Sequence, residues 1–209
     1  MKLLLHEKLL LISIDKEKGM AVGGGTFLSY ALAGALLAEL LFQNRIAIEN
    51  KMVVVKDSSP TNNILYDEVL AELSRSAKNR TLYYWIPKLV KATRPLLKKV
   101  GDSLQDKGLV RREDTRLLRI FPVTKFYVVQ PDVWQRLVSE MTEELVLVRE
   151  PDWEMNMLIS LLHSCGFLLR HFKRDERREV ARRARAMVKE NIIAKTVERV
   201  IAAIQAATS

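Results

Sequence analysis

The sequence predicts a mainly α-helical protein: one domain, residues 1–209, arranged as a helical bundle around a buried central helix with two β-hairpins. The central helix is indicated by residues 20–38, which carry no charged side chain. Three glycines, residues 23–25, interrupt this run, so we expect a helix from Thr26 to Gln43. A helix that is apolar on nearly every side lies in a core or a bilayer, and with glycine and polar residues in the run we expect the core.

Two segments with alternating apolar residues predict the hairpins. The first covers residues 45–55 with a turn at Asn50-Lys51, and the second covers residues 109–129 with residues 111–114 near its turn. Asn62 or Asn63 is expected to cap a helix that follows. Apolar spacing predicts further helices over residues 3–14, 82–107 (broken near Pro87 or Pro95), from 131 onward, and through most of 152–206. The absence of a fixed-period repeat favours one domain.

The charge balance points to a polyanionic partner. There are 34 Lys and Arg against 25 Asp and Glu, for a net charge of +9. Such an excess attracts nucleic acid or anionic lipid without choosing between them. Cys165 is the only cysteine, which excludes an intramolecular disulfide and favours a reducing compartment. The apolar start is interrupted at residues 6–8 before it reaches the length of a signal sequence, so we expect a cytoplasmic location.

No pattern indicates an enzyme, a metal site or a cofactor. His6, His163 and His171 lack metal-ligand spacing, and His163 and Cys165 would point to different helix faces. The glycine run lacks the lysine and hydroxyl of a phosphate-binding loop. Glu39 stands alone among leucines, and a buried acid needs a partner, so we expect a structural ion pair there.

Basic residues form a first cluster before the second hairpin. Lys88, Lys91, Arg94 and Lys98 recur at helical spacing, followed by Lys99. The hairpin then mixes cations with apolar residues, among them Arg116, Leu117, Leu118 and Arg119. Alternating cations and large apolar groups suit the interface of an anionic membrane.

A second cluster lies near the C-terminus, where Arg174, Arg178, Arg182 and Arg185 form a ridge at helical spacing. Such a run is as often a solvated face as a binding site. We therefore treat this ridge as a secondary candidate.

An alternative interpretation, nucleic-acid binding, uses the same first cluster of basic residues. A helix ending near residue 110 and followed by a charged hairpin is similar to the last helix and wing of a winged-helix DNA-binding domain. The preceding segment lacks an obvious helix-turn-helix, and the apolar N-terminal half has no role in such a module. Nucleic acid is therefore the alternative partner.

Taken in order, several segments resemble the Golgi phosphoprotein 3 family, over residues 3–170. They are the opening leucine-rich helix with Glu7, the turn glycine Gly19, the central stretch 34–40 with residues 45–46, residues 63–70, and residues 104–110. The resemblance implies a peripheral membrane protein that binds phosphatidylinositol 4-phosphate, with a possible role as an adaptor for membrane-protein sorting. It also implies that the second hairpin, where Leu117 and Leu118 fall, takes part in self-association and membrane insertion.

The family's lipid-binding residues carry over only in part. Arg94 matches one arginine of the family pocket, whereas Gly24, Ala33 and Leu97 stand where the family has a tryptophan and two arginines. We predict a headgroup site at Lys91, Arg94, Lys98 and Lys99, and a membrane or self-association hairpin at Arg116, Leu117, Leu118 and Arg119. The expected partners are anionic membrane lipids, with a homo-oligomer through the hairpin.

Overall fold

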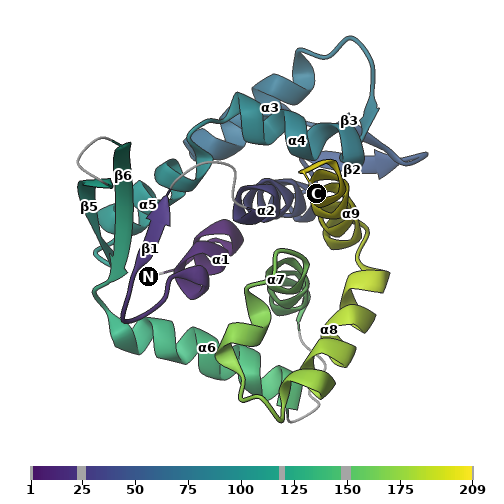
Figure 1. The fold of residues 1–209 in the computed structure, drawn as a ribbon. Coiled ribbons are helices and arrows are strands. Elements are labelled where there is room, and N and C mark those ends of the chain that lie inside the picture. The colour runs from purple at the N-terminus through teal and green to yellow at the C-terminus, as the bar shows by residue number, and fades with distance from the viewer. Residues whose placement is uncertain (1, 23–26, 118–120, 147–151, 209) are drawn as a thin grey trace.

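The prediction of a mainly helical bundle around a buried central helix is confirmed. The computed structural model describes residues 2–22, 27–117, 121–146 and 152–208. Helix α2 (Phe27–Phe42) occupies the centre, surrounded by α1 (Leu5–Ser13), α7 (Trp153–Ser164) and α9 (Ile192–Thr208) (Figure 1). Residues 31–40 are all buried. No helix among the described residues is both long and apolar enough to cross a membrane.

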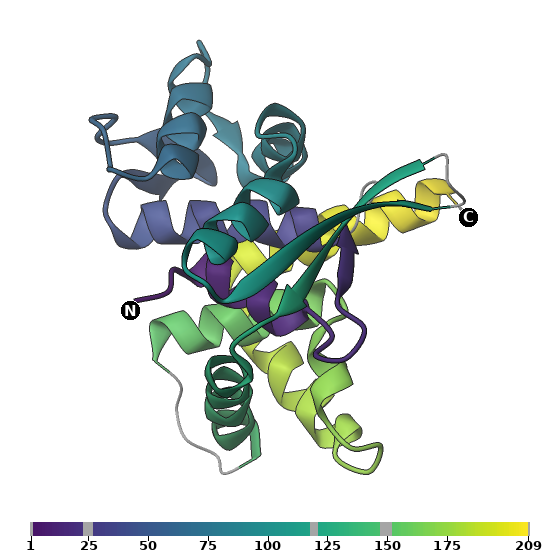
Figure 2. The ribbon, with the colours of Figure 1, turned by 90° about the vertical axis from the view of Figure 1, so that its left-hand side faces the viewer.

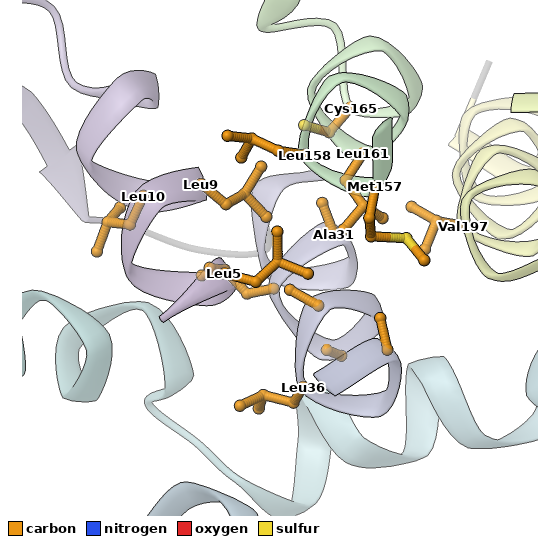
Figure 3. Packing of buried hydrophobic residues seen from close by; sticks show 14 of the residues in the cluster. Leu5, Leu9, Leu10, Ala31, Leu36, Met157, Leu158, Leu161, Cys165 and Val197 are labelled. Atoms are coloured by element: carbon orange, nitrogen blue, oxygen red, sulfur yellow. The ribbon is translucent and has the colours of Figure 1, made fainter. Parts of the chain in front are cut away.

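Small side chains on α2 allow its neighbours to approach closely. A Cβ added to Gly34 would lie 2.8 Å from a methyl group of Val197 on α9. In the core, leucines of α1 and α7 converge on the alanine-rich surface of α2 (Figure 3). Helix α2 is therefore buried by protein, because α1, α7 and α9 supply apolar faces that pack against it.

The remaining helices cover this core. They are α3 (Ile64–Ser74), α4 (Leu82–Ala92), α5 (Leu96–Asp106), α6 (Pro131–Val146), the short 3-10 helix η1 (Leu168–His171) and α8 (Arg177–Glu190). The cap of α3 is Asn63, whose side chain accepts hydrogen bonds from the backbone of Leu65 and Tyr66. Of the two asparagines proposed as caps, the second therefore fills that role.

The first hairpin forms as expected from β2 (Ile46–Glu49) and β3 (Met52–Val55). Asn50 and Lys51 both have positive φ, 48° and 66°, as a two-residue turn of this kind requires. A third strand, β4 (Arg80–Thr81), pairs with β3. The sequence did not predict β4, because two residues carry no alternation.

The second hairpin forms from β5 (Val110–Leu117) and β6 (Phe121–Val128), but its turn lies further along the chain than predicted. Arg111 pairs with Tyr127 and Leu117 pairs with Phe121, so residues 111–114 lie within β5 and not near the turn. The strand β1 (Met20–Val22), also unpredicted, adds to β6 and completes a sheet of order β1-β6-β5. The hairpin extends away from the helices (Figure 2).

The helical stretch 82–107 is broken at Pro95, while Pro87 lies inside α4 without ending it. A residue that precedes proline is disfavoured in the helical conformation, which explains a break at Arg94. The predicted single helix face therefore does not exist. Lys88 and Lys91 lie on α4, Arg94 lies in the connection, and Lys98 lies on α5.

Helix α5 packs directly against the second hairpin through Gly101. A Cβ at this position would lie 2.1 Å from the ring of Phe126 on β6, a side chain that is fully buried. Only glycine allows the aromatic ring to sit on the helix backbone. This contact fixes the hairpin relative to the basic residues of α5.

Candidate functional site

Lys91, Arg94 and Lys98 are three of the four cations that the sequence predicts for the headgroup site. Lys91 and Arg94 are exposed, Lys98 is half-buried, and none of them forms an ion pair within the described part of the chain. Because an unpaired ammonium or guanidinium keeps its full charge available, these three groups can bind phosphate oxygens without first breaking an internal contact.

Lys98 lies on the side of α5 that faces the hairpin. A hydrogen bond from Thr124 and contacts with Arg112 lower the pKa of Asp114 on β5, and the charge of Lys98 contributes to the same shift. Arg112 also bonds Asp102 of α5, at 3.1 Å. The helix and β5 are thus joined by polar contacts as well as by the glycine contact, and Lys98 stays beside the hairpin.

Lys99 faces in a different direction from Lys98. Its ammonium lies 2.6 and 2.7 Å from the two carboxylate oxygens of Glu68 on α3. Neighbouring helix residues point about 100° apart, which explains why two consecutive lysines reach different partners. Of the four predicted headgroup residues, Lys99 is therefore held in an ion pair with Glu68, and the other three form none with any described residue.

The predicted hairpin residues are described only in part. Arg116 is exposed near the end of β5, and the backbone of Leu117 pairs with Phe121. Leu118 and Arg119 lie outside the described residues. Arg116 forms no ion pair in the described part of the chain, which adds a fourth unpaired cation on the hairpin that extends from the helical body (Figure 2).

The two positions at which the resemblance implies arginines hold buried apolar side chains. Ala33 is fully buried in α2, and Leu97 is 6% exposed on α5. Gly24 lies outside the described residues. Neither Ala33 nor Leu97 can donate a hydrogen bond from its side chain, so Arg94 and its lysine neighbours are the donors that remain of the predicted headgroup site.

The C-terminal ridge is partly neutralised by a neighbour. Arg182 and Arg183 both bond Glu179, at 2.5 and 2.9 Å, and these contacts lower the pKa of that carboxyl to about 2. Arg178 and Arg185 are exposed and form no ion pair within the described part of the chain. The ridge keeps part of its charge but is an open helix surface.

The protein interior contains polar contacts, of which the sequence predicted one, at Glu39, and missed another, at Glu7. Glu39 was expected to have a buried partner, and its partner is His6, whose Nδ1 lies 2.7 Å from a carboxylate oxygen. The buried carboxylate of Glu7 is bonded by Ser103 and by Lys107. Burial alone would raise the pKa of Glu7, but the Leu4 N–H, Lys107 and Ser103 together lower it.

Cys165 is buried in the core, and burial raises the pKa of its thiol to about 12. Its hydrogen bond goes to the Leu162 carbonyl and not to a histidine. Within the described residues, no group of three or more His, Cys, Asp or Glu is arranged to hold a metal ion.

One comparison with known proteins covers nearly the whole chain. The model of the family Golgi phosphoprotein 3 (GPP34) matches residues 5–204. The match begins at the first residue of α1 and extends into α9, so it includes both hairpins and the cluster around Arg94.

Proposed function

This chain belongs to the Golgi phosphoprotein 3 family, and from that premise we propose that it docks peripherally on anionic membranes through Lys91, Arg94, Lys98 and Arg116. The observation that carries the proposal is that these four cations have no internal ion-pair partner among the described residues, although the chain holds many carboxylates. Each basic residue near an anionic surface contributes about 1 kcal/mol, so four acting together support reversible binding.

The contacts between α5 and the hairpin favour a single docking face. The ring of Phe126 lies on Gly101, and Arg112 joins Asp102 to Asp114. Lys98 and the hairpin are therefore held in one rigid arrangement. A pre-organised set of charges loses less conformational entropy on binding than the same charges on flexible segments.

Phosphatidylinositol 4-phosphate is the headgroup that the family implies, and we propose it as one ligand within a broader preference for anionic lipids. The burial of Ala33 and Leu97 favours the broader preference, because a stereospecific site needs several donors at set positions. We extend the proposal to self-association through the hairpin and to an adaptor role in membrane-protein sorting, both on family grounds.

Co-sedimentation with liposomes tests the docking face. Reversing two charges, Arg94→Glu with Lys98→Glu, is expected to weaken binding to phosphatidylserine vesicles by at least about 30-fold, from about 1 kcal/mol for each lost cation. The matched control is Arg178→Glu with Arg185→Glu, two exposed and unpaired arginines on α8. A loss confined to this control pair would move the interface to the C-terminal ridge and reject the proposed face.

Headgroup preference is measured with vesicles of equal total charge that contain either phosphatidylserine or phosphatidylinositol 4-phosphate. Equal binding supports recognition by charge, and a preference above about tenfold supports a specific pocket. The nucleic-acid alternative predicts tight binding to duplex DNA with a steep salt dependence, together with weak binding to vesicles. That pair of results would contradict the membrane proposal.

A further inference from the structure

The outer face of α4 combines aromatic and basic side chains. Between Glu72 and Asp102 every charged residue is basic, and α4 lies inside this stretch. The helix buries its other side in the core through Leu82, Trp85, Ile86 and Leu89. Its exposed rings and charges belong to Tyr83, Tyr84, Lys88 and Lys91. The surface that α4 presents to solvent is therefore positively charged and partly aromatic.

The two tyrosines project toward the same side of α4 as Lys91. Seven residues make nearly two helical turns, so Tyr84 and Lys91 point in almost the same direction and lie about 10 Å apart along the axis. Tyr83 points roughly 80° away from Lys91. Tyr83 is 46% exposed and Tyr84 is 43% exposed. Because Lys91 belongs to the proposed docking face, the two rings extend that face along α4.

An arginine lies over each tyrosine ring. The guanidinium of Arg80 is 5.1 Å from the ring centroid of Tyr84, and that of Arg199 is 5.6 Å from the ring centroid of Tyr83. Arg199 comes from α9, which lies beside α4 (Figure 1). Both arginines are exposed, and neither forms an ion pair with a described residue. Each ring is thus held beside a cation that no described carboxylate neutralises.

This combination of groups matches the chemistry of an anionic membrane interface. A tyrosine has an apolar ring and a polar end, and it is enriched at the level of lipid headgroups. Neither hydroxyl of Tyr83 or Tyr84 has a hydrogen-bond partner among the described residues, so both remain available to water and headgroups. The arginines beside the rings can bind phosphates at the same depth.

Stacking of nucleic-acid bases fits these rings less well. A base stacks on an open ring face. A guanidinium already lies over the ring of Tyr83 and over that of Tyr84, and Trp85 packs edge-on with Tyr84 at a centroid distance of 5.3 Å. The geometry therefore favours a lipid surface as the partner of this face.

We propose that α4 supplies an aromatic part of the docking face, in which Tyr83 and Tyr84 enter the headgroup region of an anionic membrane and Arg80 and Arg199 bind lipid phosphates. This inference rests on the proposed docking function and adds an apolar contact to it. The unpaired cations attract the membrane from a distance, and salt weakens that attraction. The rings act only on contact, and salt does not screen their burial.

The first measurement locates α4 relative to the bilayer while both tyrosines stay in place. Pro87→Cys puts a thiol at an exposed position one turn from both Tyr83 and Lys91, whereas Cys165 is buried. A nitrobenzoxadiazole label at residue 87 is expected to gain fluorescence on vesicles of equimolar phosphatidylcholine and phosphatidylserine. Lipids with a nitroxide near the headgroup are expected to quench it. The same label at Ala186→Cys, an exposed position on α8, is the matched control and should not respond.

The second measurement removes the rings. Tyr83→Ser with Tyr84→Ser is expected to weaken binding to the same vesicles about tenfold, because the exposed part of each ring no longer leaves water. This tenfold ratio should persist as salt is raised, whereas the effect of Arg94→Glu with Lys98→Glu should shrink. Phe42→Ser is the matched control. Phe42 is 64% exposed and stacks on Trp153 of α7, so its loss should leave the affinity unchanged.

A label at residue 87 that shows no response on vesicle-bound protein would overturn the proposal. Unchanged vesicle affinity of the tyrosine double variant, with its fold verified by circular dichroism, would also overturn it. If this variant lost binding to single-stranded DNA and kept its vesicle affinity, the face would be assigned to nucleic acid. All three outcomes leave docking through Arg94 and Lys98 intact, whereas failure of the unsubstituted protein to bind any anionic vesicle rejects both proposals.

Discussion

Replacing Lys107 by Met should show how much the ion pair between Lys107 and the buried carboxylate of Glu7 contributes to the free energy of unfolding. Glu7 is 1% exposed, and the Lys107 ammonium lies 2.5 and 2.6 Å from its two oxygens. Methionine keeps most of the length of the side chain but removes the charge. Removal of one partner from a buried ion pair costs about 3–5 kcal/mol.

The expected loss is smaller than that full value. The carboxylate would keep the hydrogen bonds from Leu4 N–H, at 2.9 Å, and from Ser103, at 2.7 Å. We therefore expect a loss of about 2–3 kcal/mol in the free energy of unfolding at neutral pH. For a chain of this length that corresponds to a decrease of about 4–12 °C in Tm, measurable by circular dichroism or calorimetry.

The pH dependence identifies the cause. The pKa of Glu7 in the folded protein is lowered from 4.5, so its ionised form stabilises the fold above that value. This contribution is lost as the pH falls through the folded pKa. In Lys107→Met the carboxylate lacks its cation, and protonation relieves the unpaired charge. The difference in stability between the two proteins should therefore shrink as the pH falls from 7 to below 4.

A difference that stays constant over this pH range would refute the electrostatic explanation and assign the loss to packing of the lysine stem. A double-mutant cycle with Glu7→Gln provides the control. If the ion pair is responsible, Lys107→Met should cost little in a protein that already contains Glu7→Gln.

Two further predictions follow from the core. Gly101→Ala should lower the free energy of unfolding by about 1–3 kcal/mol in chemical denaturation, because the Cβ of alanine overlaps the ring of Phe126 even though alanine favours helices. Adding Phe126→Leu should restore part of the loss. An unchanged denaturation midpoint in Gly101→Ala would contradict the contact. Cys165 should react with a thiol reagent at pH 8 only at the rate of unfolding, because the thiol is buried and its pKa is raised to about 12. Rapid modification of the folded protein would show that the segment around Cys165 opens.

The identity of most elements could be predicted from local patterns. The absence of charge over residues 20–38 predicted the buried helix α2, and the Asn50-Lys51 turn predicted the first hairpin. Asn63 was one of two candidates for the cap of α3, and the hydrogen bonds of its side chain decide between them. These features depend on residues close together in the chain, which is why sequence reasoning found them.

The direction in which each side chain points, and the partner with which it pairs, could not be predicted from those patterns. Sequence spacing placed Lys88, Lys91, Arg94 and Lys98 on one helix face, whereas the chain breaks at Pro95 and divides them between two helices. Lys98 and Lys99 were grouped in one site, but Glu68, on another helix, holds Lys99.

The net positive charge of this protein follows from its composition alone, because net charge is a sum over residues and does not depend on the fold. Which cations remain available is a tertiary property, because it depends on carboxylates that are distant in the chain and are brought near only by packing. The same holds for the contact between His6 and Glu39, two buried residues that lie 33 positions apart and that α1 and α2 bring together. Local sequence specifies helices and turns, and long-range packing decides which polar groups are left free to bind.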